Sequence, residues 1–150
     1  MMQLSGIWQD IWNNFEHVAL AYLLTASIGW VSERQAQSAG VRTFPIVGMA
    51  SCGYLLLLGS QPDAAAQSRL LQGLITGIGF IGGGAILRQR STVRGTASAA
   101  SVWNAGVIGS AVAMNHYGIA VTLALLNLLT LRALLPLKKW LDRKAEIENR

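Results

Sequence analysis

Apolar residues gather in five long stretches that short polar segments separate. Each stretch has 18 or 19 residues, enough for a helix to cross about 30 Å of hydrocarbon. Inside them only Glu16 and Arg132 are charged. A backbone in lipid must satisfy its own hydrogen bonds, so we expect an all-α membrane protein, a bundle of five transmembrane helices. The expected spans are residues 15–32, 43–60, 70–87, 96–114 and 117–135.

Both flanking segments show an amphipathic pattern instead. Apolar residues recur at three- and four-residue steps from Leu4 to Phe15, with Trp8 and Trp12 among them. This spacing is typical of a short N-terminal helix lying in the membrane interface; an irregular tail is the alternative. The residues after Pro136 mix basic and apolar side chains and predict a short helix on the inner leaflet. No Lys or Arg occurs in the first 14 residues, so we expect no cleaved signal peptide.

The distribution of charge predicts the orientation of the chain. Only 13% of residues are charged, against about 25% in a soluble domain. With the N-terminus outside, eleven of the twelve Lys and Arg residues lie on the inner side and only Arg69 lies outside. The positive-inside rule therefore predicts an N-out, C-in inner-membrane protein, with residues 1–150 forming one domain. The net charge of +5 thus reports orientation, and we expect lipids rather than nucleic acid as its partner.

The residues that usually carry chemistry are few. One cysteine, Cys52, and two histidines exclude a disulfide framework and a four-ligand Cys/His zinc site. No carboxylate lies at mid-depth in any expected span, which argues against a metal or proton pathway through one subunit. Cys52 has no histidine near it in the sequence. We expect no enzyme activity, no catalytic residue, no metal and no cofactor.

Small residues dominate the third and fourth spans. Gly77 to Gly82 spell G-x-G-x-x-G, but the strand and the acidic residue of a dinucleotide site are missing. Glycine faces let membrane helices approach closely. Three alternatives remain: packing within one chain, a seam between two copies, and a broken helix lining a site. The expected packing residues are Gly73, Gly77, Gly79, Gly83, Asn104 and Gly106.

Two helices are expected to start on the inner side with the same pair of residue types. Arg42 precedes Thr43, and Arg94 precedes Thr96. A helix N-terminus carries partial positive charge and N–H donors, so an added arginine favours an anion site. The alternative is that each threonine caps its helix and each arginine obeys the positive-inside rule. The predicted anion or partner site comprises Glu33, Arg34, Arg42, Thr43, Arg94 and Thr96, with Glu33 as counter-ion to the arginines.

The motifs and their order resemble the MgtC/SapB family over about 80 residues. They are Glu33-Arg34, Gly40-Val41-Arg42-Thr43, Gly77-Ile78-Gly79-Phe80-Ile81-Gly82 and Val93-Arg94-Gly95, followed by Trp103. The resemblance implies a small inner-membrane regulator linked to magnesium limitation, stress and virulence, which in some members acts on ATP synthase. Larger members carry a soluble C-terminal domain, so we expect the short form. Val31-Ser32 and Thr96-Ala97 depart from the family pattern.

The leading functional expectation is regulation of a larger membrane complex by lateral helix contact. One alternative is a small-ion or solute channel formed by an oligomer. Another is a membrane module that binds phosphate or lipid headgroups. The missing intramembrane acid argues against the cation channel, and the paired Arg-Thr helix starts favour the headgroup alternative.

Overall fold

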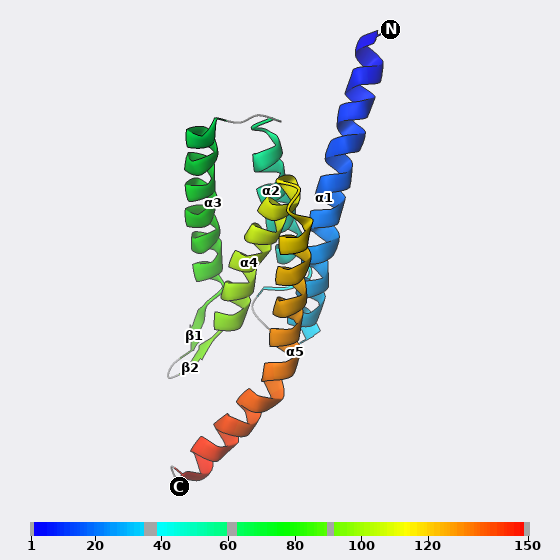
Figure 1. The fold of residues 1–150 in the computed structure, drawn as a ribbon. Helices are drawn as coiled ribbons and strands as arrows, with labels where there is room; N and C mark the ends of the chain where they lie inside the picture. The colour runs from blue at the N-terminus through cyan, green and yellow to red at the C-terminus, as the bar shows by residue number, and fades with distance from the viewer. Residues whose placement is uncertain (1, 35–38, 60–62, 90–91, 149–150) are drawn as a thin grey trace.

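The structure is a computed structural model that describes residues 2–34, 39–59, 63–89 and 92–148. Five helices run up and down in one bundle, and a short hairpin connects the third to the fourth (Figure 1). The elements are α1 (Met2–Arg34), α2 (Thr43–Leu56), α3 (Ala64–Gly84), β1 (Leu87–Gln89), β2 (Thr92–Arg94), α4 (Thr96–Ala113) and α5 (Tyr117–Glu148). The two chain ends lie at opposite ends of the bundle (Figure 1).

The five expected helices are confirmed, but their ends differ. α1 is one unbroken helix, so the expected separate interfacial helix is its first part, which projects beyond the bundle (Figure 1). Asn13 to His17 contain no glycine or proline that would interrupt the helix. α5 likewise continues through Pro136, which costs a backbone hydrogen bond without ending the helix.

A two-stranded hairpin between α3 and α4 was not expected. β1 and β2 pair antiparallel, with Leu87 opposite Arg94 and Gln89 opposite Thr92. Strands of three residues are too short to show alternating polarity, so the hydrophobic pattern did not predict them. Gly95 follows with φ of 86°, a left-handed conformation that glycine adopts without strain. This residue turns the chain from β2 directly into α4.

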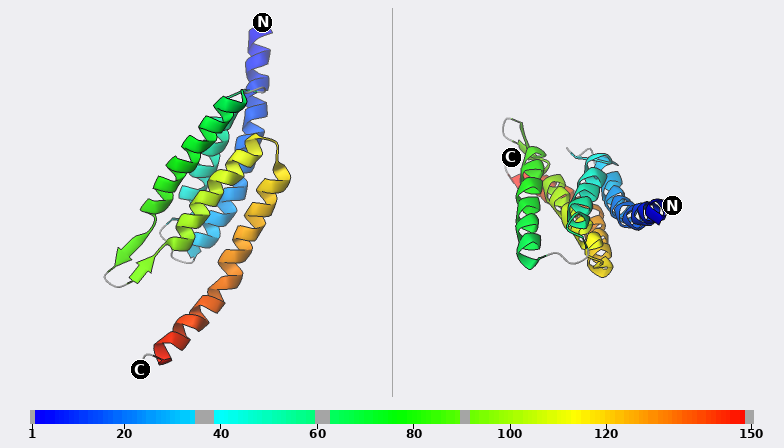
Figure 2. Two further views of the ribbon diagram at one scale, coloured as in Figure 1. Left: turned by 60° about the vertical axis from the view of Figure 1, so that its left-hand side comes forward. Right: turned by 90° about the horizontal axis from the view of Figure 1, so that it is seen from above.

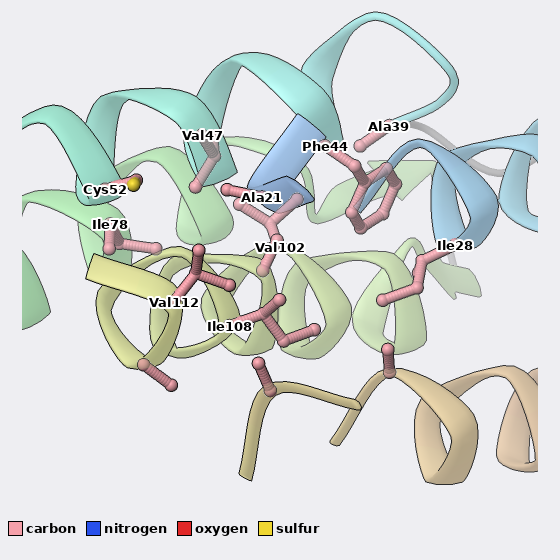
Figure 3. Packing of buried hydrophobic residues seen from close by; sticks show 14 of the residues in the cluster. Ala21, Ile28, Ala39, Phe44, Val47, Cys52, Ile78, Val102, Ile108 and Val112 are labelled. Atoms are coloured by element: carbon pink, nitrogen blue, oxygen red, sulfur yellow. The ribbon is translucent and has the colours of Figure 1, made fainter. Parts of the chain in front are cut away.

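The core is organised around α4, which packs against all four other helices. Figure 3 shows buried side chains from α1, α2, α3 and α4 meeting there, among them Phe44, Val102 and Ile108. Gly109 of α4 faces the Gly48 backbone of α2, and a Cβ at Gly109 would collide with the Gly48 carbonyl oxygen. The contact between α2 and α4, the most extensive of the helix pairs in the described residues, is therefore built on small residues.

The third helix stands apart from the remainder of the bundle. Seen from above, α3 and α1 lie at opposite edges (Figure 2). Ile78 is its buried anchor, and a Cβ at Gly106 of α4 would overlap the Ile78 side chain. Gly82 lies close to the backbone of Ala99, with 3.1 Å between a Cβ built there and the carbonyl oxygen. α3 is thus attached mainly to α4.

One helix meets the length and composition needed to cross a membrane. In the described residues it is α5, over Tyr117–Leu134. α2 (Thr43–Leu56) is apolar but shorter. The described ranges therefore contain five helices, one of which is a candidate span.

Candidate functional site

The expected site residues lie at the end of the bundle that carries the hairpin. α1 and α3 end there, and α2 and α4 begin there (Figures 1 and 2). Glu33 and Arg34 close α1, Arg42 precedes α2, and Arg94 ends β2. We call this region the hairpin end. Among the described residues, neither the Arg42 nor the Arg94 guanidinium makes a hydrogen bond or an ion pair. Arg90 and Arg150, counted above among the inner cations, lie outside the described residues.

Glu33 holds the chain that leads into α2. Its carboxylate accepts a hydrogen bond from the Val41 N–H at 3.1 Å. A Cβ at Gly40 would occupy the position of this carboxylate, so a side chain there would displace Glu33 from the Val41 N–H. Glu33 forms no ion pair with an arginine among the described residues. The expected counter-ion is instead an acceptor for the backbone of the α1–α2 connection.

Arg34 is placed by an aromatic ring of its own helix. Its guanidinium carbon lies 5.0 Å from the centroid of Trp30, within the range of a cation–π interaction. Both side chains are exposed, which limits the contribution to about 0.5–1 kcal/mol. Arg34 therefore presents its charge beside an aromatic face at the end of α1.

Two buried hydroxyl groups tie α1 and α4 to the α1–α2 connection at the hairpin end. Ser32 of α1 donates to the Ala39 carbonyl at 2.7 Å. The Ala39 N–H donates to Ser98 Oγ of α4 at 3.0 Å. Both serines are fully buried. The sequence does not predict these hydrogen bonds because Ala39 and Ser98 are 59 positions apart. The only indication in the sequence was a polar residue, Ser98, within the small-residue run of α4.

The two helix starts are not equivalent. In α2 the N–H groups of Thr43 and Phe44 both point at the Gly40 carbonyl, at 3.1 and 3.4 Å. The next residue, Pro45, has no N–H. The start of α2 is therefore closed by its own loop, and this differs from the expected pair of open helix starts.

The start of α4 is less occupied. Gly95 is its N-cap residue and has no side chain to cap it. Among the described residues, the N–H groups of Thr96 and Ala97 make no hydrogen bond to a neighbouring element. Neither Thr43 nor Thr96 caps its helix in the part of the chain that the structure describes. Arg94 stands directly before the open start.

The expected glycine face of α3 is open. A Cβ built at Gly73, Gly77, Gly79 or Gly83 would meet nothing within 4 Å. The alternative of close packing within one chain therefore does not describe these four positions. The motif packs through other residues, Ile78 and Gly82.

Two apolar cavities flank the line along which α3 touches the bundle. One of about 220 Å³ lies between α2 and α3 and is lined by Val47, Tyr54 and Gly77, among others. The other, of about 160 Å³, lies between α3 and α4 beside Trp103. Phe80 on the outer side of α3 is 86% exposed. α3 thus offers an apolar outer face with hollows at both sides.

Polar side chains connect α4 to α5. Asn104 Nδ2 donates to the Leu123 carbonyl at 3.4 Å. Ser101 Oγ donates to Asn127 Oδ1 at 2.9 Å. Asn127 and Ser101 were not among the residues expected to matter. Both bonds lie at a groove of about 300 Å³ on the outside of the bundle.

A second polar cluster lies at the opposite end of the bundle. His17 Nε2 lies 3.0 Å from Asn115 Oδ1, and His17 Nδ1 lies 2.9 Å from the Asn13 carbonyl. Tyr117 donates to the same Asn115 oxygen at 2.7 Å. The cluster joins α1 to the turn between α4 and α5.

The reactive and metal-binding side chains of the described residues limit the chemistry that this protein can carry out. Among the residues that the structure describes, no three His, Cys, Asp or Glu side chains are close enough to hold a metal ion. Cys52 is fully buried in the core between helices (Figure 3). The hairpin end offers arginines and backbone donors, which suit an anion. The face of α3 is apolar, which suits an apolar partner surface.

Comparison with known proteins relates this chain to one family. The MgtC family profile matches residues 18–140. Protein SrpB of Synechococcus elongatus is 30% identical over 143 residues, covering 85% of this chain and 79% of the relative. "Putative magnesium transporter YhiD" of Escherichia coli K12 is 28% identical, covering 75% of this chain and 56% of the relative. Protein MgtC of Brucella abortus is 26% identical, covering 69% and 43%. No solved structure matches.

Proposed function

The chain belongs to the MgtC family of membrane proteins, and we propose that it is a non-enzymatic, five-span protein of the bacterial inner membrane. In this proposal it regulates a larger membrane complex by lateral helix contact. Its role belongs to adaptation to magnesium limitation and stress, in keeping with relatives named MgtC and a relative named for magnesium transport. The chain spans about half the length of these two relatives.

The open face of α3 is the observation that supports lateral contact. Membrane helices associate where small residues let backbones approach, since lipid offers no hydrophobic drive. Four glycines of α3 have free space at the Cβ position. The same helix exposes Phe80 and Ile75 beside two apolar cavities. A helix of a partner protein fits this surface, and the ATP synthase is the partner that family resemblance suggests.

Site-specific crosslinking in the membrane tests this proposal. A photoreactive residue at Gly79 of α3 should capture a protein from a larger complex, which mass spectrometry would identify. The matched control is the same probe at Leu129 of α5, which is 61% exposed. Capture of only lipid from Gly79, or equal capture from Leu129, would contradict a contact through α3.

A second candidate function rests on the start of α4. Its first N–H groups lack partners among the described residues, and Arg94 precedes them. We propose that this end binds a phosphate-bearing headgroup, with Arg94 as its main cation. Arg42, beside the closed start of α2, contributes less.

Titration with soluble short-chain phospholipids and with inorganic phosphate tests the second candidate. Arg94→Gln should weaken headgroup binding more than Arg42→Gln, and Arg94→Lys should rescue poorly because a lysine cannot form a bidentate fork. Thermal shift of the detergent-purified protein gives the readout. Equal binding by wild type and Arg94→Gln would contradict the headgroup site and would mean that these arginines only set the orientation of the chain.

A further inference from the structure

The groove between α4 and α5 carries polar groups on a surface that faces out of the bundle. We call it the amide groove. Ala97, Ala100 and Ser101 of α4 form one wall, and residues of α5 form the other. Asn104 and Asn127 both line it and are only partly buried. α5 is the helix that meets the requirements for a membrane span, so these amides lie at a depth where water is scarce.

Each amide uses one of its two polar atoms within the chain. Asn104 donates through Nδ2 to the Leu123 carbonyl, and its Oδ1 has no partner among the described residues. Asn127 accepts through Oδ1 from Ser101, and its Nδ2 has no partner in the same described set. The groove therefore presents one unused acceptor and one unused donor.

Leaving an amide donor and acceptor without partners in hydrocarbon is costly. Lipid tails cannot supply the missing bonds, but another helix can. The occupant must offer both a donor to Asn104 and an acceptor or second amide for Asn127. An acyl chain offers neither.

We propose that the amide groove is the interface between two copies of this chain. In a two-fold dimer each residue pair is repeated, so residue i meets j and j meets i. One unused acceptor and one unused donor per chain satisfy this condition. Asn104 of each copy accepts from Asn127 of the other, which closes two equivalent hydrogen bonds.

The depths of the two amides are compatible with this pairing. Asn127 lies level with Ser101, its hydrogen-bond donor on α4. Ser101 and Asn104 are three positions apart, a rise of about 4.5 Å along the helix. In two copies related by an axis along the membrane normal, equivalent residues lie at equal depths. Each Asn104–Asn127 hydrogen bond must therefore bridge only this difference in depth, which is less than one helical turn. Ala97 and Ala100 leave room for the approach.

Disulfide trapping in membranes locates the interface. The native Cys52 is fully buried and can remain. Ala100→Cys and Leu126→Cys both place a thiol on the groove, and oxidation should trap covalent dimers from these variants. Phe80→Cys is the control, since it is 86% exposed on α3. Trapping at Phe80 but not at the groove would place the seam on α3 and overturn the proposal, as would the absence of any dimer.

A double-variant comparison tests the reciprocal pair itself. Asn104→Leu and Asn127→Leu should each weaken dimerisation about tenfold, or about 1.4 kcal/mol, because each removes two interhelical hydrogen bonds per dimer. The double variant should be no weaker than either single one, since the two amides bond each other. Thr76→Leu on α3 is the matched polar control and should leave dimerisation unchanged.

Thermal unfolding of the monomer in dilute detergent separates folding from association. Each single asparagine variant also loses one α4–α5 hydrogen bond within the chain. Variants that dimerise weakly while their monomers still unfold cooperatively above the temperature of the dimerisation assay support the interface. Additive losses in the double variant, or unchanged dimerisation in both single variants, would overturn it. The lateral-contact proposal does not depend on this outcome, because its probe lies on α3.

Discussion

The glycines of this chain differ in what lies opposite their Cα atoms. Gly109 meets the Gly48 carbonyl of α2, and Gly48 itself lies against Thr25, 2.6 Å from a Cβ to Thr25 Oγ1. Gly83 has nothing within 4 Å. The sequence places all of them in helices and cannot distinguish them, because the distinction depends on the neighbouring helix.

This difference predicts opposite responses to the same substitution. Gly109→Ala should destabilise the purified protein by about 1–3 kcal/mol, because the methyl group forces α2 and α4 apart. Gly83→Ala should be neutral or stabilising by up to about 1 kcal/mol, the helix-propensity gain of alanine over glycine. Thermal unfolding in detergent measures both. A larger loss at Gly83 than at Gly109 would contradict the observed packing.

Ser98 supplies a second prediction at the residue scale. Ser98→Ala leaves the buried Ala39 N–H without its acceptor, at a cost of about 1–3 kcal/mol. The α1–α2 connection that carries Arg42 should loosen with it. Hydrogen exchange of the Ala39 and Val41 amides gives the local readout. Ser68→Ala, an exposed position on α3, is the control and should change neither property.

At the scale of elements, hydrophobic runs identified the helices well and their ends less well. Each expected span overlaps one helix because lipid-length apolar runs leave few other options. The union of residues 2–34 into α1 was not predicted because the pattern changes from amphipathic to apolar near Asn13, although no glycine or proline interrupts the helix there. The hairpin was not predicted because its six paired residues are too few to show an alternation of polar and apolar side chains.

The candidate site was only partly predictable for the same physical reason. The motif residues lie at one end of the bundle, since odd helices end where even ones begin. Their individual roles depend on contacts across the fold. Glu33 bonds a backbone N–H instead of an arginine, and Pro45 with Gly40 closes the start of α2.

The junction between hairpin and α4 carries a prediction of its own. Gly95 has φ of 86°, where a Cβ costs roughly 1–2 kcal/mol. Gly95→Ala should therefore lower the melting temperature and alter the direction in which Arg94 leaves β2. Gly95→Asn should cost less, because asparagine tolerates this conformation better. Gly53→Ala, in α2 with open space around it, serves as the control and should not destabilise.

At the scale of the whole molecule, recognition features fall on three separate surfaces. The hairpin end gathers charge and backbone donors, α3 presents an open glycine face, and the α4–α5 side presents the amide groove. α4 touches all of the other helices and lies between the latter two surfaces. A dimer through the amide groove therefore leaves α3 available for a partner complex.

The final prediction is the orientation of the bundle. Its two termini lie at opposite ends (Figure 1), as five crossings would require, and eleven of twelve cations lie on one side of the expected spans. A reporter fused after residue 150 should therefore read cytoplasmic, and one fused before residue 1 periplasmic. Arg42→Gln should not change either signal, because the remaining inner cations still outnumber Arg69. A periplasmic signal from the C-terminal fusion would mean that one helix enters the membrane without crossing it.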